Sequence, residues 1–461
     1  MNKLIYLLYC SIIALLFLSF TSCDRYNDTP NNTVSIDKYE RELVNRWVDQ
    51  LVRLGQLSPG MTPPVVARGF GYSALALYET CLPVIESNIS MKGQIVEWQG
   101  LSTKPQTNVN YHWGVVINTL MSTMCLEFAG INNRQQWKEE FLALESDYND
   151  KYKLECTTDE FNASVAYAKA CSQEIIDFAK TDPIYNTITT EPKEPMNSNY
   201  PVDYDPPVGK GLWVPTAPTY QIAMQPYWGV SRPFLKRNVD LRPADPNPYS
   251  EDTTSLYYKE MLEVYNAAVN LTPEQKITAL YWDDAPFKTQ TPGGHSVKIY
   301  NQLMRENKFP VSQSIESFLK VSMAIHDAFV NCWKYKFTFN SERPITFIHD
   351  FMKKEEFTPV ITTPPFPDYC SGHSNQSGAA MTIFNLQFGE NYIFTDSANV
   401  TRDDIDAITK APRTYKKFRD MYNEVAMSRL YGGIHFRKSI EEGVRIGNLI
   451  GENIWNLNYK K

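Results

Sequence analysis

The sequence predicts an all-α protein of packed helical bundles, interrupted by one long proline-rich irregular segment. Apolar residues recur at helical spacing over most of the chain, as in Ile36, Tyr39, Leu43, Trp47 and Leu51. No stretch alternates apolar and polar residues for long enough to predict a strand. The 461 residues, 43% apolar and 21% charged, have the composition of a folded globular protein. The formal net charge of −7 argues against nucleic acid as a partner.

The beginning of the chain has the pattern of a secretion signal with a lipid-attachment site. Lys3 precedes an apolar run over Leu4–Phe20, and small residues then lead to Cys23, as in a bacterial lipobox. The run is short for a membrane span. We therefore expect residues 1–22 to be a lipoprotein signal peptide and residues 23–34 to be a tether that begins at lipidated Cys23. The protein would then be lipid-anchored in the bacterial cell envelope, facing the periplasm or the cell surface; a retained transmembrane anchor is the alternative.

Residues 35–182 are expected to form an N-terminal helical region. Helical periodicity and start signals, such as the proline pair at Pro63 and the acidic pair at Asp159, locate its helices. The predicted helices cover residues 36–57, 63–82, 110–129, 133–152 and 159–181.

The periodicity is lost over residues 183–250. Thirteen of the chain's 29 prolines fall between Pro183 and Pro248. So long an irregular stretch is either a linker or an ordered segment that wraps near a site. Its aromatic residues, among them Trp213 and Trp228, favour the ordered wrapping segment, because linkers are seldom aromatic.

Residues 251–461 are expected to form a C-terminal helical domain that carries the chemistry. The predicted helices cover residues 254–269, 273–282, 295–306, 312–334, 371–388, 413–431 and 437–457. The last helix carries Gly443, Gly447 and Gly451 on one face. Because glycine lowers helix propensity, this row predicts a close approach to another helix.

Cysteine spacing predicts no particular disulfide. Six cysteines follow Cys23, and an oxidising compartment would permit disulfides among them. The absence of a C-x-x-C motif argues against a structural zinc site.

The strongest chemical signal lies at the start of the 371–388 helix. Ser371 is a favourable N-cap residue, so the free N–H groups of the first turn, with Gly372 at its start, point at whatever lies in front of them. Together with the imidazole of His373, this is a small anion site with a proton donor. An ordinary capped helix is the alternative for this stretch taken alone.

Two cationic blocks flank this stretch. Lys336-x6-Arg343-Pro344 lies upstream, and Ser428-Arg429-x5-His435 lies downstream. Three cations and a helix N-terminus suit a tetrahedral oxyanion, because a guanidinium group binds two oxygens at once. Two histidines can then divide the work: one is a nucleophile or metal ligand, and the other is a general acid and base.

These three blocks resemble the three-part signature of the superfamily of vanadium haloperoxidases and type-2 phosphatidic acid phosphatases. All three occur in the family's order and with its internal spacings. The segments at 63–78, 211–229 and 282–292 further resemble bacterial vanadium-dependent haloperoxidases. The resemblance implies an all-α fold with an oxyanion site at the end of a helical bundle.

The resemblance also implies a role for each residue. His435 would bond to vanadium or attack phosphorus, and His373 would be the acid–base residue. In a haloperoxidase, hydrogen peroxide on the vanadate is polarised by Lys336 and attacked by a halide; in a phosphatase, the phosphoryl group passes to His435 and is hydrolysed. The oxygens of vanadate or phosphate would be held by Lys336, Arg343, Ser371, Gly372 and Arg429.

Three further residues match haloperoxidase positions. Trp333 and Phe366 stand where those enzymes place aromatic residues around the halide, and Asp284 matches a carboxylate that orients the acid–base histidine. We therefore expect a vanadium haloperoxidase, with vanadate as cofactor and halide and hydrogen peroxide as substrates. The first alternative is a periplasmic acid phosphatase that needs no metal and hydrolyses a phosphomonoester through a phosphohistidine; the second is a degenerate phosphate-binding member.

Two positions depart from the family pattern. Cys370 replaces the usual proline before Ser-Gly-His, which would loosen the loop. Ser439, four residues after His435, replaces an aspartate that many members use to fix the tautomer of that histidine, and a serine stabilises an imidazolium less. Glu441 or Glu442 could substitute for the missing carboxylate.

The remaining histidines are not assigned to the site. His112, His326 and His349 are expected to be structural. His295, in a family-like segment after Gly293-Gly294, could line the pocket.

Overall fold

The computed structural model describes residues 35–187, 204–286 and 288–461. The predicted signal peptide (1–22), lipidation site (Cys23) and tether (23–34) lie outside these residues, as does part of the proline-rich segment. Residues Ile36–Lys461 pack as one unit. Within the described part of the chain, none of the helices combines the length and the apolar character that crossing a membrane requires.

The described residues are mostly helical, which confirms the predicted all-α class. Regular strands among them are limited to one short antiparallel pair, β1 (Phe394–Asp396) and β2 (Arg413–Tyr415). The α-helices are α2 (Glu42–Leu57), α3 (Pro63–Cys81), α4 (Trp113–Tyr152), α5 (Thr158–Lys180), α6 (Pro183–Thr187), α7 (Lys236–Val239), α8 (Leu256–Val269), α9 (Pro273–Tyr281), α10 (Thr291–Glu306), α11 (Val311–Phe339), α12 (Pro344–Asp350), α13 (Gly372–Phe388), α14 (Phe418–Tyr431) and α15 (Arg437–Trp455). Short 3₁₀ turns are η1 (Ile36–Lys38), η2 (Leu82–Val84) and η3 (Trp228–Val230).

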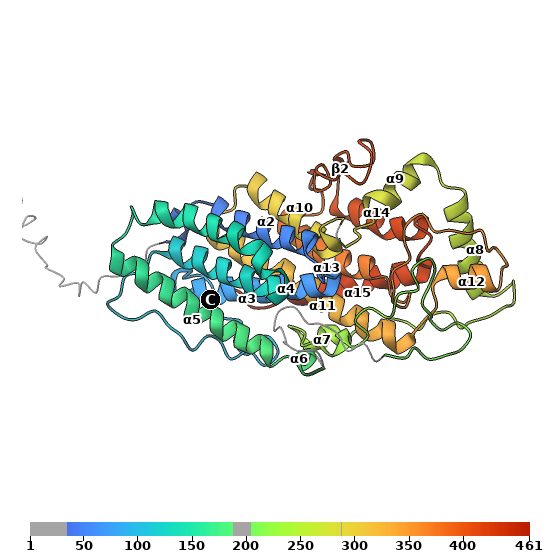
Figure 1. Cartoon of the computed structure of the whole chain (residues 1–461), viewed down its shortest axis with the longest axis horizontal. Coiled ribbons are helices and arrows are strands. Elements are labelled where there is room, and N and C mark those ends of the chain that lie inside the picture. The colour runs from blue at the N-terminus through green and yellow to red at the C-terminus, as the bar shows by residue number, and fades with distance from the viewer. Residues whose placement is uncertain (1–34, 188–203, 287) are drawn as a thin grey trace, which may run out of the picture. The chain divides into compact units, whose positions relative to one another are not determined.

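Helix α11 joins the two ends of the helical array. It packs along α3 among the N-terminal helices and along α13 and α15 among the C-terminal ones (Figure 1). Helices α4 and α5 pack on each other, and α2 packs on α4 and α10. Helix α11 therefore belongs to both groups of helices.

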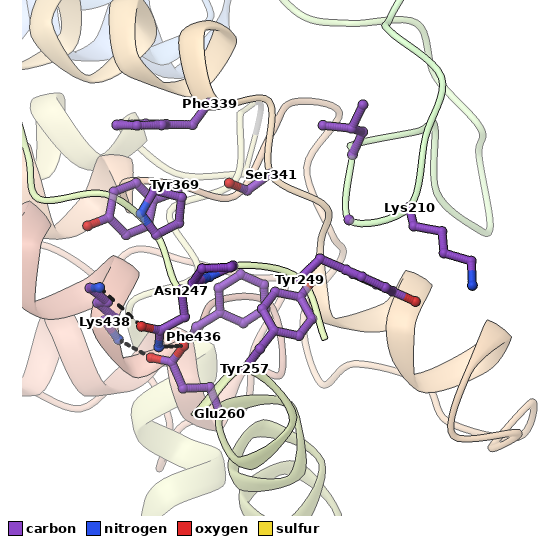
Figure 2. A pocket seen from close by; sticks show the side chains of 14 residues that line it. Lys210, Asn247, Tyr249, Tyr257, Glu260, Phe339, Ser341, Tyr369, Phe436 and Lys438 are labelled. Atoms are coloured by element: carbon purple, nitrogen blue, oxygen red, sulfur yellow. Dashed lines mark hydrogen bonds between the residues drawn. The ribbon is translucent and has the colours of Figure 1, made fainter. Parts of the chain in front are cut away.

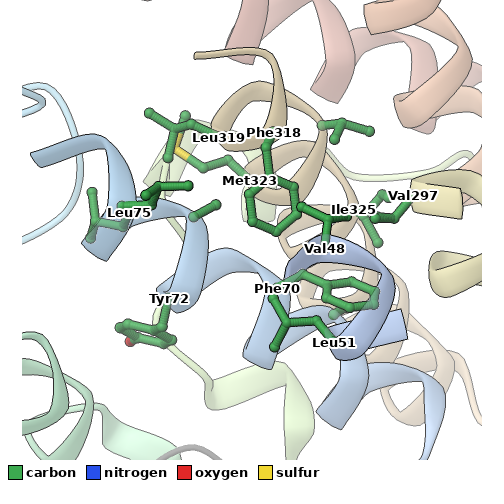
Figure 3. Packing of buried hydrophobic residues seen from close by; sticks show 14 of the residues in the cluster. Val48, Leu51, Phe70, Tyr72, Leu75, Val297, Phe318, Leu319, Met323 and Ile325 are labelled. Atoms are coloured by element: carbon green, nitrogen blue, oxygen red, sulfur yellow. The ribbon is translucent and has the colours of Figure 1, made fainter. Parts of the chain in front are cut away.

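A continuous apolar core fixes α11 against α2 and α3. Phe318 and Ile325 of α11 meet Val48 of α2 and Phe70 of α3, and all four side chains are buried (Figure 3). Burying a side chain of this size stabilises a fold by about 1.5–3 kcal/mol. The core therefore sets the position of α11 before any polar contact at its C-terminal end is considered.

Several predicted boundaries are wrong. The helix expected over 413–431 begins at Phe418, because Arg413–Tyr415 pairs with β1 and the Tyr415 ring stacks on Phe394. The helices expected over 36–57, 295–306 and 312–334 instead begin at Glu42, begin at Thr291 and end at Phe339, respectively.

The break expected between 110–129 and 133–152 is present inside α4, where Gly130 has a non-helical backbone conformation with φ 69°. Glycine adopts this backbone conformation without the strain that a side chain would add.

Capping residues fix the two helix ends that meet at the predicted site, the C-terminal end of α11 and the N-terminal end of α13. Helix α11 ends at Asn340, whose left-handed conformation (φ 48°) turns the chain just after Lys336 and before Arg343. Asparagine is one of the few residues that adopts this conformation readily. Helix α13 starts at Ser371, whose hydroxyl accepts the N–H of Ser374 at 3.4 Å.

The glycine row of α15 lies directly against α13, as predicted. A Cβ atom added at Gly443 would lie 2.9 Å from the carbonyl oxygen of Ser371, and one at Gly447 would lie 2.1 Å from that of Asn375. At Gly451, the carbonyl oxygen of Ala379 would be 2.6 Å away. Only glycine permits this approach, which brings the start of α15 against the start of α13.

We predict that Gly447→Ala destabilises the protein. Alanine normally stabilises an exposed helix position by about 0.5–1 kcal/mol relative to glycine. Here the added methyl group would force the two helices apart, at a cost of about 1–3 kcal/mol. A lower midpoint of urea or thermal unfolding is expected. Glu452→Ala, at an exposed position of the same helix, is the control and should leave the midpoint almost unchanged; equal stability of the two variants would contradict the packing described.

Candidate active site

Segments far apart in the sequence meet at the N-terminal end of α13, where a cavity of about 330 Å³ lies. Gly372, His373, Arg429 and His435 line it. The other predicted oxyanion-binding residues are fully buried beside these lining residues. The remaining lining residues are Thr62, Pro63, Thr219, Gln221, Met224, Asp283, Asp284, Ala285, Pro286, Lys288, Pro292, Phe329, Trp333, Thr362, Thr363, Pro364, Pro365, Phe366 and Ile434.

Lys336 is buried in the last turn of α11. Its ammonium group donates to the carbonyl oxygens of Pro367 (2.8 Å) and Asp368 (2.6 Å) and lies over the ring of Phe366. Burial lowers the pKa of Lys336 to about 8. The carbonyls hold the amine in position but bring no full negative charge, so a nearby anion would stabilise the ammonium form.

Arg343 ties together two loops of the site. Its Nε donates to the carbonyl oxygen of Phe366 (2.7 Å), and its Nη1 donates to that of Ile434 (2.9 Å). Its Nη1 also lies 3.1 Å from Nε2 of His435. Its Nη2 is buried without a hydrogen-bond partner among the described residues. Such a donor is costly to leave unpaired, so it marks a place where an acceptor belongs.

Arg429, in the last turn of α14, also has a buried donor without a hydrogen-bond partner among the described residues. Its Nη1 donates to the carbonyl oxygen of Trp282, while its Nε has no partner in the described part of the chain. Burial lowers the pKa of Arg429 to about 10, although Asp283 and Asp284 act in the opposite direction. Burial also lowers the pKa of Arg343 to about 10, with Arg429 adding to the effect. Arg343 and Arg429 are therefore buried cations that each keep a donor without a partner among the described residues.

His435 is neutral, and its tautomer follows from its neighbours. Burial, followed by the positive charges of Arg343, Lys336 and Arg429, lowers the pKa of His435 well below its ordinary value. A guanidinium group can only donate, so the contact with Arg343 favours the tautomer in which Nε2 accepts and Nδ1 carries the proton. His435 therefore has a lone pair on Nε2, the form that can attack phosphorus or bind a metal.

The proton-bearing side of His435 faces Asp368 and Ser439. Oδ1 of Asp368 lies 2.7 Å from Nδ1, and the Ser439 hydroxyl lies 3.3 Å from the same atom. Burial raises the pKa of the Asp368 carboxyl, against the opposing effect of Arg343 and Lys336. The alternatives expected from the sequence are wrong: Glu441 is exposed and Glu442 pairs with Arg445.

His373 projects from the first turn of α13 into the cavity. Its Nε2 has no hydrogen-bond partner among the described residues and lies 3.9 Å from Oδ2 of Asp284, too far for a hydrogen bond. Burial, and then the charge of Arg429, lowers the pKa of His373 well below its ordinary value. A neutral imidazole with a free nitrogen in a cavity can take up a proton from a ligand.

Asp284 is held mainly by a different histidine. Nδ1 of His295 lies 2.9 Å from Oδ1 of Asp284, and Nε2 of His295 lies 3.0 Å from Oδ2 of Asp396. Burial opposes a charge on His295, but the two carboxylates outweigh it and raise the pKa of His295 to about 10. His295 is absent from the cavity lining and binds Asp284 from within the core.

The three other histidines have structural contacts, in line with the expectation from the sequence. The ring of His326 bonds to the carbonyl oxygen of Arg232, and that of His349 bonds to the carbonyl oxygen of Phe357. His112 caps α4 by accepting the N–H of Val115.

Aromatic residues form the apolar part of the cavity. The rings of Trp333 and Phe366 lie 4.9 Å apart, and the indole N–H of Trp333 donates to the carbonyl oxygen of Met224. Thr219, Gln221 and Met224 reach the cavity from the proline-rich segment. The described part of that segment therefore contributes to the site wall.

A second, smaller cavity of about 200 Å³ lies on another side of the same loops (Figure 2). Tyr369 and Phe436, which neighbour residues of the first site in sequence, line it. Its polar side chains bond to one another: Glu260 accepts from Asn247, and Lys438 donates to Asn247. It thus lacks the unpaired donors of the first cavity.

Sequence reasoning located the three blocks but missed Asp368 and the buried role of His295. Asp368 lies three residues before Ser371 in the sequence, and its acidity next to a predicted anion site was the available signal. At the helix start, Gly372 and His373 line the cavity, while Ser371 is buried outside the lining and its hydroxyl bonds to that of Ser374.

Comparisons with known proteins agree with this geometry. Residues 316–460 match a family model described as the VCPO second helical-bundle domain. The chain is similar to the first bacterial vanadium-dependent iodoperoxidase of known structure, with 28% identity and a TM-score of 0.79, covering 91% of this chain and 97% of that one.

Two further structures, of bacterial vanadium-dependent chloroperoxidase, share the fold. The holo form has 15% identity and a TM-score of 0.64, and covers 87% of this chain and 92% of that one. The match to the apo form has 17% identity and a TM-score of 0.63, and it covers 87% of this chain and 95% of that one. The search of curated proteins finds no match.

We predict that Arg343→Lys weakens the binding of orthovanadate and orthophosphate by about 10–100-fold. Lysine keeps the charge but loses the planar fork and its unpaired donor. Hydrogen bonds to charged groups contribute about 1.5–3 kcal/mol, which corresponds to this change in affinity. Isothermal titration calorimetry measures the effect. Arg445→Lys, on the exposed side of α15, is the control; equal affinities in the two variants would show that Arg343 does not bind the anion.

Proposed function

Because the chain belongs to the superfamily of vanadium haloperoxidases and type-2 phosphatidic acid phosphatases, we propose that it is a vanadium-dependent haloperoxidase that oxidises halide with hydrogen peroxide. One observation carries the proposal: buried cationic side chains with unpaired donors surround a histidine whose Nε2 lone pair is free of a proton. The similarity to an iodoperoxidase over 91% of the chain favours iodide as the first halide to test.

The residues present fit a vanadate ion. Within the described ranges, Arg343 Nη2 and Arg429 Nε are donors without acceptors, and an oxyanion would supply those acceptors. Vanadate, when bound, supplies a Lewis-acidic metal centre that activates hydrogen peroxide toward a halide. We assign its oxygens to Lys336, Arg343, Ser371, Gly372 and Arg429. Its metal atom would bind His435, whose Nε2 lone pair would give up the hydrogen bond from Arg343 Nη1.

The protein's own groups would divide the remaining work. His373, neutral and with a free nitrogen in the cavity, would take a proton from peroxide and return one later. Lys336 would stabilise negative charge from its fixed place between two carbonyls. Trp333 and Phe366 would keep water from the reacting atoms and offer a polarisable apolar surface to the halide.

We predict that the purified protein halogenates a phenolic dye with iodide or bromide and hydrogen peroxide only when orthovanadate is present. His435→Ala should lower this rate to background, because it removes the metal ligand. His349→Ala, which changes a histidine outside the cavity, should keep most of the activity.

Two other outcomes would overturn the proposal. Hydrolysis of p-nitrophenyl phosphate without vanadate, inhibited by vanadate, together with no halogenation, would identify an acid phosphatase that uses the same pocket. Neither activity, with phosphate still bound, would identify an anion-binding member without catalysis.

We also propose that the protein is anchored in the bacterial cell envelope by a lipid on Cys23. The support is the sequence alone, in which an apolar run ends in a lipobox-like motif. Mass spectrometry of the protein from its bacterial host should find diacylated Cys23 as the first residue. A mature chain that still begins with residues 1–22 would contradict the anchor.

A further inference from the structure

The position of Asp368 has a consequence for how His435 works. Four residues after His435, where a carboxylate could reach Nδ1 from the first turn of α15, the chain has Ser439. The Ser439 hydroxyl is 3.3 Å from Nδ1 and also 3.3 Å from the carbonyl oxygen of Asp368. A hydroxyl in that place can accept from Nδ1 while donating to the carbonyl, but it carries no charge.

The carboxyl group of Asp368 lies closer to the same nitrogen. Its Oδ1 is 2.7 Å from Nδ1 of His435, the separation of a charge-assisted hydrogen bond. In the structure the ring N–H is not directed at the oxygen, so neither oxygen of Asp368 has an aligned hydrogen bond among the described residues. Both side chains are buried, so no bulk water competes for either group.

The loop that carries Asp368 is itself fixed. The backbone N–H of Asp368 donates to Ser341 (3.0 Å), and its carbonyl accepts from Lys336 (2.6 Å). Nη1 of Arg343 lies 3.9 Å from Oδ1 of Asp368, which is too far for a hydrogen bond. The carboxyl group is therefore held beside His435 by the same loop that starts α13.

We infer that Asp368 is the positioning residue of His435 in this chain: from the loop before α13, its carboxyl group keeps the proton on Nδ1 and the lone pair on Nε2, in place of an acid at position 439. The inference rests on the proposed function for its effect on vanadate, but the effect on the imidazole tautomer exists without any ligand. Carboxylate partners of metal-binding histidines typically change metal affinity by about 10–100-fold.

The test combines two readouts on Asp368→Asn and Asp368→Ala. Nitrogen-15 NMR of the His435 ring, in protein without vanadate, reports which nitrogen carries the proton. Calorimetry with orthovanadate reports affinity. We expect Asp368→Ala to lose the single Nδ1–H form, and Asp368→Asn, whose amide oxygen can still accept from Nδ1, to keep more of it. Both variants should bind vanadate about 10–100-fold more weakly, because both lose the carboxylate charge. Glu79→Gln, a buried carboxylate of α3 that bonds to Ser90 and Met91 and is absent from the cavity lining, is the matched control and should change neither readout.

A carboxylate placed at position 439 tests whether the loss in the Asp368 variants comes from the missing charge beside His435 or from altered packing of the loop. Adding Ser439→Asp to Asp368→Ala should return the Nδ1–H form and recover at least tenfold in vanadate affinity. If the Asp368 variants keep the wild-type ring signals and bind vanadate within threefold of wild type, the inference is wrong.

A different failure is also informative. Weaker vanadate binding with an unchanged His435 tautomer would make Asp368 only a counter-charge for Arg343, which also overturns the inference. A wild-type protein that binds vanadate without halogenating would refute the proposed function alone, because the ring signals of the Asp368 variants would still decide the role of this residue.

Discussion

The contact between α13 and α15 is the constraint on which the site depends. Backbone lies against backbone because Gly443, Gly447 and Gly451 present no side chains to α13. The carbonyl of Ser439 accepts the N–H of Ser371 at 3.1 Å, at the end of the same contact. Helix packing therefore brings the anion-binding start of α13 and the loop with His435 together. The basic side chains do not have to hold these two backbone segments in place themselves.

Bringing three positively charged side chains together in a buried site costs electrostatic free energy. Lys336, Arg343 and Arg429 are all buried, and burial disfavours their charged forms. Backbone carbonyls at Pro367, Ile434 and Trp282 offset part of that cost. What remains is strong attraction for a multiply charged anion, together with two histidines kept neutral at ordinary pH. The same burial thus produces both the binding and the chemistry that we propose.

Much of this could be predicted from the sequence, because the helices have strong periodicity and the three blocks have fixed internal spacing. The strand at Arg413–Tyr415 could not, since a three-residue strand exists only through its partner at Phe394–Asp396. Asp368 could not be assigned to His435, because their proximity depends on how α13 and α15 cross.

The failure of Glu441 and Glu442 as substitutes was predictable in principle. Ser439 and Gly443 repeat at a spacing of four, so they share the face that packs on α13. Glu441, two positions after Ser439, therefore points to solvent. Glu442 is engaged by Arg445 and by the backbone N–H of Ala244 instead. Spacing on a helix face, rather than charge alone, decides which acid can reach a given ring.

The cavity is lined partly by helix ends and partly by loops, and these two parts differ in how well they tolerate substitutions. The inner wall is made of helix ends locked by glycine contacts and buried cations. Much of the outer wall comes from loops, at Thr219–Met224 and Thr362–Phe366, where insertions and exchanges are better tolerated. Changes in these loops can therefore alter which molecules enter the cavity while the residues that hold the anion stay the same.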